Sequence, residues 1–329
     1  MSSSSVPVAE RVQTRADSLP WYIWTAFLAT ACSIFGLYWD ISWHMSIGRD
    51  TFWTPAHLVI QSGGVLAGLS CAFLILHTTF AGSPSDTRAT VNFWGFRGPL
   101  GAFIIAWGGF AMITSAPFDN WWHEAYGLDV KIVSPPHTLL LFGLVGIQTG
   151  ALVLVRGAIS RSAGAMRNKL ERVFLVIAGL VLIQLCMFIL EYTGFSMQHS
   201  ARCYYVVDSG VPLILLAAAK ALDRRWSCTT VASIYTIFWL AMQWIFPLFP
   251  ARPKLGPVYQ PVTHMVPLGF PLLLIAPAVV IDLIYPRIRH WNRWAQASLA
   301  GVLFLAVFIL VQWPFAEFLL TPMARNWIF

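Results

Sequence analysis

The sequence predicts an all-α, polytopic integral membrane protein, built as a bundle of about nine transmembrane helices. Composition indicates the membrane first, because 57% of the 329 residues are hydrophobic and only 11% are charged, whereas soluble domains carry about 25% charged residues. The mean hydropathy is +0.67. Apolar runs long enough to cross the bilayer as helices of about 20 residues recur along the chain. They do not alternate apolar and polar residues as the strands of a membrane barrel would.

The predicted spans cover residues 21–39, 54–78, 97–117, 136–156, 172–194, 203–222, 228–249, 263–286 and 297–320. Together they predict a single transmembrane domain over residues 21–329, preceded by a short N-terminal segment over residues 1–20. That segment has no apolar core of the kind found in cleaved signal peptides, so we expect the first span to remain as an anchor. Residues 21–156 hold a duplicated hairpin, and residues 172–320 hold the remaining helices.

The distribution of basic residues predicts the orientation. Most of the 21 Lys and Arg residues fall in the segments that lie on the same side as the N-terminus, and basic residues are retained on the cytoplasmic side. We therefore expect a multi-pass protein of a bacterial-type inner (plasma) membrane, with a cytoplasmic N-terminus and the loops after the odd-numbered spans outside. The same rule accounts for the net charge of +7, so we expect contact with membrane lipid and no nucleic-acid partner.

Two of the outer connections carry the same motif, in the stretches WDISWHMSIGRDTFWTPAHLVI and FDNWWHEAYGLDVKIVSPPHTLL. The matched residues are Asp40 and Asp119, Trp43 and Trp122, His44 and His123, Gly48 and Gly127, Asp50 and Asp129, Thr54 and Ser134, Pro55 and Pro135, and His57 and His137. The second copy has one residue more after Asp129. Each copy begins where an odd-numbered span ends and closes where the next begins, which indicates a duplicated helical hairpin.

The spacing within the repeat is typical of a metal site. An aspartate and a histidine four residues apart share one face of a helix. The later histidine follows Thr-Pro or Ser-Pro, which predicts an N-cap with proline at the first helical position and places the histidine in the first turn. The candidate ligands are Asp40, His44 and His57 in the first copy and Asp119, His123 and His137 in the second. Two imidazoles and one carboxylate suit Cu(II), Zn(II) or non-haem Fe(II).

A structural interpretation of the same residues stays open. Each aspartate could simply orient a histidine and cap a helix end. The neighbouring tryptophans, which are Trp43, Trp53, Trp121 and Trp122, could either anchor the protein at the membrane interface or shape an apolar pocket. Glu124 adds a possible oxygen donor beside His123, which would favour zinc or iron at the second site.

The first copy resembles the metal-site motif in the C subunit of the copper membrane monooxygenases, the particulate methane and ammonia monooxygenase family. That motif has an aspartate, a histidine four residues later, a stretch containing Arg-Asp-Thr, and a histidine in Thr-Pro-x-His. Here these are Asp40, His44, Arg49 to Thr51, and Thr54 to His57. The resemblance covers about 20 residues and implies copper bound by Asp40, His44 and His57. The second copy lacks the Arg-Asp-Thr element, and nine spans exceed the number we would expect for that subunit.

The leading hypothesis is therefore a copper-dependent membrane monooxygenase component that oxidises a small apolar molecule or ammonia with dioxygen. It would need partner membrane subunits and an electron donor, because no flavin, haem c or iron–sulfur motif is present. The alternatives are a non-catalytic copper-binding or copper-delivery membrane protein, and a b-type haem protein with paired histidines. The roles of Glu191, His199 and His264 stay open.

Overall fold

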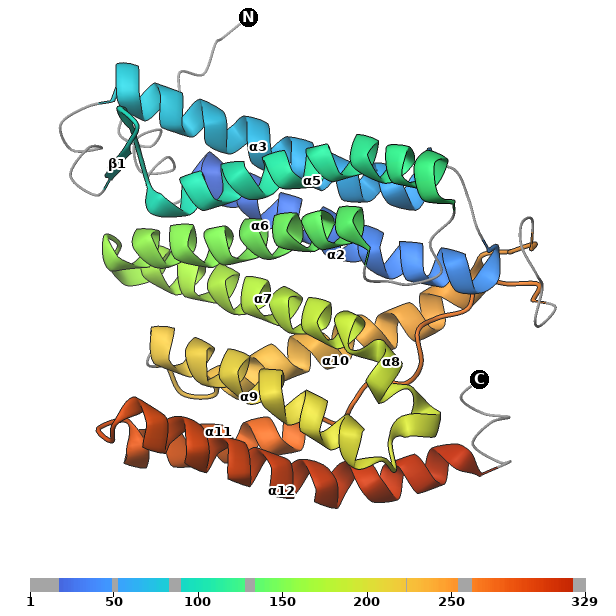
Figure 1. Ribbon diagram of the computed structural model, residues 1–329. Helices are drawn as coiled ribbons and strands as arrows, with labels where there is room; N and C mark the ends of the chain where they lie inside the picture. The colour runs from blue at the N-terminus through green and yellow to red at the C-terminus, as the bar shows by residue number, and fades with distance from the viewer. Residues whose placement is uncertain are drawn as a thin grey trace, which may run out of the picture. The chain divides into compact units, whose positions relative to one another are not determined.

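The computed structural model describes residues 18–48, 53–82, 90–127, 134–222, 224–253 and 262–321. It is an all-α helical bundle (Figure 1). Within these residues, eight helices are long and apolar enough to cross a membrane, so the protein is a multi-pass membrane protein, as predicted. The long helices are α2 (Trp21–Ser46), α3 (Pro55–Phe80), α5 (Leu100–Tyr126), α6 (Pro135–Ser160), α7 (Gly164–Phe188), α9 (Ala201–Leu222), α10 (Ser227–Ile245) and α12 (Arg293–Leu320).

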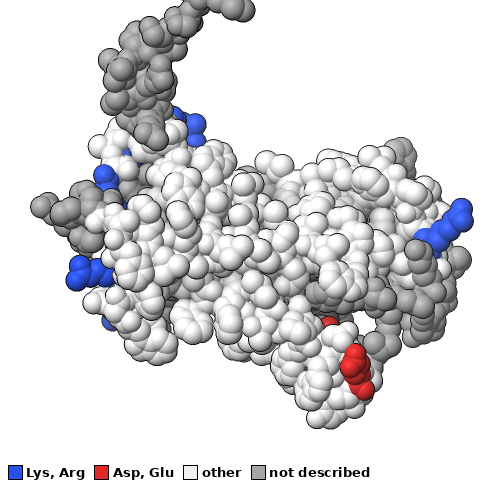
Figure 2. All heavy atoms as spheres, turned by 90° about the horizontal axis from the view of Figure 1, so that it is seen from above, with Lys and Arg blue, Asp and Glu red and all other residues white. Residues whose placement is uncertain are grey.

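The remaining elements are short. They are the helices α8 (Leu190–Thr193) and α11 (Ile275–Ile288), the 3₁₀ turns η1 (Phe195–Met197) and η2 (Phe246–Leu248), and the antiparallel strands β1 (Val91–Phe93) and β2 (Phe96–Gly98). Figure 2 shows one face of the molecule, on which most of the described surface is uncharged and the Lys, Arg, Asp and Glu side chains form a few small groups. A surface that faces lipid carries few charged side chains, because charges are unfavourable there.

The chain divides into two compact units. One comprises the chain up to Thr30 together with Ser62–Phe174, and the other comprises Ala31–Gln61 together with Leu175–Phe329. The helices α2, α3 and α7 each contribute residues to both units. The first copy of the motif therefore belongs to the second unit, and the second copy belongs to the first unit.

Glycines allow the close packing of α5 against α6 in the first unit. A Cβ atom at Gly108 would lie 2.7 Å from the backbone nitrogen of Ile147, and one at Gly143 would lie 2.8 Å from the backbone nitrogen of Met112. Neither position has room for a larger residue. Close backbone approach through small residues is a common way for helices to pack in membranes, where no difference in hydrophobicity drives them together.

The prediction of a helical span over residues 263–286 was wrong. Residues 262–274 are irregular, and only α11 is helical in this region. Its 14 residues extend about 21 Å at 1.5 Å per residue, less than the hydrocarbon thickness of about 30 Å. The sequence explains the break: Pro267 and Pro271 are four residues apart with Gly269 between them, and each proline removes a helical hydrogen bond and clashes with the preceding turn.

Side chains of the surrounding helices satisfy the backbone of this irregular segment (residues 262–274). The N–H groups of Val266, Leu268, Leu272 and Leu273 donate to Ser46 Oγ, Tyr38 Oη, Tyr235 Oη and Gln312 Oε1, at 2.7 to 3.1 Å. The carbonyl of Val266 accepts from Ser42, and those of Leu268 and Gly269 accept from Trp239 and Gln243. Because non-helical backbone is tolerated at membrane depth only where the protein itself supplies its partners, this arrangement explains how a broken span is stable.

Candidate metal centre

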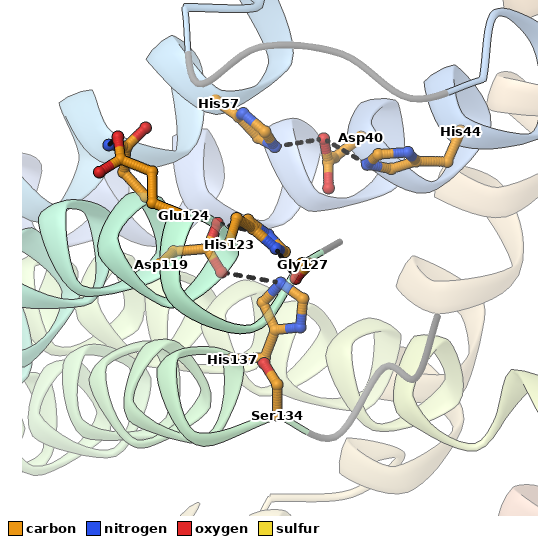
Figure 3. Close-up of polar contacts among 10 residues, drawn as sticks. Asp40, His44, His57, Asp119, His123, Glu124, Gly127, Ser134 and His137 are labelled. Atoms are coloured by element: carbon orange, nitrogen blue, oxygen red, sulfur yellow. Dashed lines mark hydrogen bonds and ion pairs between the residues drawn. The ribbon is translucent and has the colours of Figure 1, made fainter. Parts of the chain in front are cut away.

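The helix α2 presents Asp40 and His44 on one face. It continues to Ser46, beyond the predicted end at residue 39, so both residues are helical as the spacing of four requires. The Nε2 atom of His44 lies 3.7 Å from Oδ1 of Asp40. Figure 3 shows the two side chains turned toward one another along the last turns of the helix.

The third side chain comes from the start of α3. Pro55 is the first residue of that helix, so His57 lies in the first turn, as predicted. The Nε2 atom of His57 lies 3.0 Å from the same Oδ1 atom of Asp40 (Figure 3). The hairpin therefore brings three potential metal ligands to a single carboxylate oxygen.

The spacing of these atoms fits one metal ion. Asp40, His44 and His57 each offer a ligand atom within 4.8 Å of the other two. Two ligands bonded at about 2.1 Å to the same ion are about 3.0 to 4.2 Å apart, depending on the bond angle. Small side-chain movements would complete such a site, because both His44–Asp40 and His57–Asp40 distances are already in this range.

The carboxylate of Asp40 also has an oxygen that could bind a metal ion. Its Oδ1 atom is buried and accepts no hydrogen bond from the described protein, although buried polar atoms almost always have a partner. A carboxylate oxygen that faces two imidazole nitrogens without a hydrogen bond is the environment that a bound cation would satisfy. The side chain of His44 is 46% exposed, so the cluster is open on one side to solvent or to an exchangeable ligand.

The second copy of the motif gathers its residues around Asp119. The helix α5 contains Asp119 and His123, and α6 begins at Pro135 and so holds His137 in its first turn. The Nε2 atom of His123 lies 3.3 Å from Oδ2 of Asp119, and that of His137 lies 3.5 Å from Oδ1 (Figure 3). As in the first copy, the Oδ1 atom is buried without a hydrogen bond from the described protein.

The two copies differ in geometry. In the second copy the histidines approach different oxygens of the carboxylate, whereas in the first they approach the same one. The ligand atoms of the first copy all lie within 4.8 Å of one another. Among the described residues, the second copy does not form such a group. Glu124 accepts a hydrogen bond of 2.8 Å from Asn120. Its side chain is thus engaged with Asn120.

Backbone geometry positions both clusters. Gly48 and Gly127 follow the ends of α2 and α5 with φ values of 94° and 83°, a region that side chains other than glycine rarely adopt. The carbonyl oxygen of Gly127 lies 3.3 Å from Nδ1 of His123, and such a contact fixes the ring so that Nε2 faces the site. In the second copy, Gly127 thus helps to orient His123.

Of the two predicted N-caps, the structure shows one. Ser134 caps α6, since its side chain accepts a hydrogen bond of 3.4 Å from the backbone N–H of His137. The hydroxyl of Thr54, at the matched position before α3, is buried and makes no hydrogen bond within the described protein. The capping interaction is therefore present in one copy, while the proline at the first helical position is common to both.

Several other predicted features can be placed only in part. Arg49, Asp50, Thr51 and Asp129 lie outside the described residues. Trp53 and Trp121 are 73% and 52% exposed, which favours the interfacial interpretation for these two tryptophans over a closed pocket.

Sequence reasoning missed the residues that support α2 beside the site. The hydroxyl of Ser42 donates to the carbonyl of Val266, and the backbone N–H of Val266 donates to the hydroxyl of Ser46. Two serines four residues apart, alternating with Asp40 and His44 on α2, were the available signal. Their partner could not be foreseen because it is backbone from more than 200 residues later in the chain.

Comparison with known proteins adds no relative. The chain matches no known protein family, no curated protein and no solved structure. The assignment of the site therefore depends on its own geometry.

Proposed function

We propose that this multi-pass membrane protein is a metalloprotein in which Asp40, His44 and His57 bind one copper ion. The observation that carries the proposal is the convergence of both imidazole Nε2 atoms, at 3.0 and 3.7 Å, on one buried carboxylate oxygen. A structural ion pair would need only one imidazole beside that oxygen, whereas two approach it here, and it accepts no hydrogen bond from the described protein. Bound metal accounts for the arrangement with fewer unexplained polar atoms.

Copper is favoured by two considerations. Imidazole nitrogen with a carboxylate oxygen suits copper, zinc and iron, and the divalent affinity order places copper above the others. The motif also resembles the copper-site motif in the C subunit of the copper membrane monooxygenases. The proposed location of the site is the outer face of a bacterial-type inner membrane, where the positive-inside rule places the loops after odd-numbered spans.

We further propose that the site takes part in oxidation of a small apolar molecule or ammonia. Copper bound there would supply one-electron chemistry with dioxygen. The chain's own residues would hold the ion, through Asp40 and His57, and leave one side open beside the exposed His44. This role requires partner membrane subunits and an electron donor.

Metal analysis of purified protein tests the proposed site. We expect Asp40→Ala and His57→Ala to lose about one copper per chain, because two remaining ligands hold an ion weakly. The matched control is His77→Ala, which removes a histidine from the last turn of the same helix α3 and should leave the copper content unchanged. Equal copper in all three variants would show that these residues are not the ligands.

Oxygen consumption separates the catalytic proposal from copper binding without turnover. Native membranes that contain the copper-loaded protein with its partner subunits, supplied with a chemical reductant and candidate substrates, should consume oxygen, and Asp40→Ala should abolish this consumption. Retained copper without any substrate-dependent oxygen consumption would favour the non-catalytic copper-binding role.

A further inference from the structure

A second polar feature lies between α9 and α12, both within the second unit and adjacent in Figure 1. The two helices are antiparallel, because residues later in α9 contact residues earlier in α12. The ring of His199, just before α9, lies 4.8 Å from that of Trp313. The ring of Tyr204 lies 5.4 Å from that of Phe308. A methyl group placed on Gly301 would lie 3.9 Å from both carboxylate oxygens of Asp208.

Three side chains along the contact between α9 and α12, here called the seam, have buried polar atoms without a partner in the described protein. They are Nε2 of His199, the hydroxyl of Tyr204 and Oδ1 of Asp208. Tyr204 is only 5% exposed. Buried polar atoms without partners are rare and unfavourable. Three of them, on two residues of α9 and on His199 just before it, indicate that something polar can be accommodated between α9 and α12.

Of the three residues, Asp208 lies furthest along α9 from the start of the helix. Asp208 and Tyr204 are four residues apart on α9, so they share one face. Asp208 is about 10 Å along the helix from its first residue, at 1.5 Å per residue. Pro212 lies inside the same helix and has no N–H to donate to the backbone carbonyl of Asp208. A second acceptor is thus freed beside the carboxyl group.

No described charge compensates Asp208. The facing position of α12 is Gly301, and Asp208 forms no ion pair within the described chain. Two ionisable groups on the helices that pack on α9 are engaged elsewhere. Asp282 of α11 accepts from Cys228 and Thr229, and Tyr235 of α10 accepts from Leu272. An ionised carboxylate without a cation is strongly unfavourable inside a membrane protein.

We propose that Asp208 is a proton-binding group within the membrane, reached from the N-terminal end of α9 along the seam that His199 and Tyr204 line. In this step a proton from water passes by way of the imidazole of His199 and the hydroxyl of Tyr204, bridged by water where direct contact is lacking. It bonds to a carboxylate oxygen of Asp208, which becomes a neutral carboxylic acid. Release returns the proton and restores the carboxylate, so no oxidant or reductant is needed. This inference does not depend on the proposed metal site.

Infrared difference spectroscopy of protein in lipid vesicles tests the proton-binding group directly. We expect a protonated-carboxyl band that is lost at high pH and is absent in Asp208→Asn. The route is tested by the rate at which this band shifts after transfer to heavy water. Tyr204→Phe keeps the ring against Phe308 and removes only the hydroxyl, so exchange should slow several-fold. Tyr205→Phe is the matched control, because Tyr205 is 74% exposed, and it should exchange at the wild-type rate.

Labelling with a membrane-permeant carbodiimide, which reacts with protonated carboxyl groups in apolar surroundings, keeps the proposal testable if Asp208→Asn does not fold. In wild-type protein, mass spectrometry should find the label on Asp208, and the yield should fall as the pH is raised. Absence of the label and of the infrared band at every pH would overturn the proposal. Protection from the label by sodium or potassium at constant pH would also overturn it, since the group would then be a metal-cation site.

Discussion

At the level of single residues, the most informative atoms are the Oδ1 atoms of Asp40 and Asp119. Each is buried and accepts no hydrogen bond from the described protein; two histidine nitrogens approach that of Asp40, and one approaches that of Asp119. If the duplication had kept these residues for packing alone, we would expect hydrogen bonds to these oxygens, because a buried acceptor without a hydrogen bond is unfavourable. The repetition of this arrangement leads us to expect a cation at the second hairpin as well as at the proposed first site.

The second hairpin gives the first prediction. Asp119→Ala should remove a metal ion that is distinct from the copper lost in Asp40→Ala, and the double variant should lose both. We expect the second site to favour zinc or iron more than the first, because one histidine lies beside each carboxylate oxygen and an ion held between them would have both hard oxygen donors within reach.

Elemental analysis of the two single variants and the double variant measures this directly. Glu124→Gln is the control, since Glu124 contacts Asn120 through one carboxylate oxygen and an amide oxygen can accept the same bond. Identical metal content in wild type and Asp119→Ala would mean that the second hairpin is structural.

At the level of elements, the irregular segment (residues 262–274) is the main departure from a simple helical bundle. Its backbone groups bond to side chains of α2, α10 and α12. In a helix, the backbone groups form hydrogen bonds with one another, whatever the side chains are. In this segment, each backbone hydrogen bond depends on one particular side chain. Substitution of any of these partners is therefore expected to leave a backbone group unpaired.

Tyr38 provides the test. Tyr38→Phe keeps the aromatic contact with Trp239 and removes the oxygen that accepts from the N–H of Leu268. An unpaired buried N–H costs about 1–3 kcal/mol, so we expect the thermal unfolding midpoint in detergent to fall. Tyr205→Phe removes an exposed hydroxyl and should leave the midpoint unchanged; equal midpoints in both variants would contradict the role assigned to Tyr38.

At the level of the whole molecule, the orientation in the membrane stays a prediction, and it can be measured. Cysteines substituted at Trp53 and Tyr126, which are 73% and 67% exposed, report on the two motif hairpins. One at Trp94, which is 81% exposed, reports on the connection between α3 and α5. The positive-inside rule predicts that an impermeant thiol reagent added outside labels the first two and not the third.

Intact cells and everted vesicles should give opposite labelling patterns. The native cysteines set the background, and four of the five are buried. Labelling of Trp94→Cys from outside, with the two hairpin variants protected, would show that the orientation is opposite to the predicted one.

Sequence reasoning was successful where structure follows from local rules. Hydropathy predicted eight of the spans, and the spacing of Asp40 and His44 required α2 to continue past its predicted end, as it does. It failed at residues 263–286, where hydropathy counted apolar residues and ignored Pro267 and Pro271. It also could not foresee the partners of Ser42 and Ser46, because hydrogen bonds between distant parts of a chain leave no local pattern.

The irregular segment also constrains the order in which the protein is made. Leu273 donates its backbone N–H to Gln312 of α12, a helix that the ribosome completes only after the segment has been synthesised. Until α12 has been inserted, that N–H has no partner in the bilayer, where an unpaired group costs several kcal/mol. We therefore expect the segment to take its final place between α2, α10 and α12 only as a late step of membrane assembly.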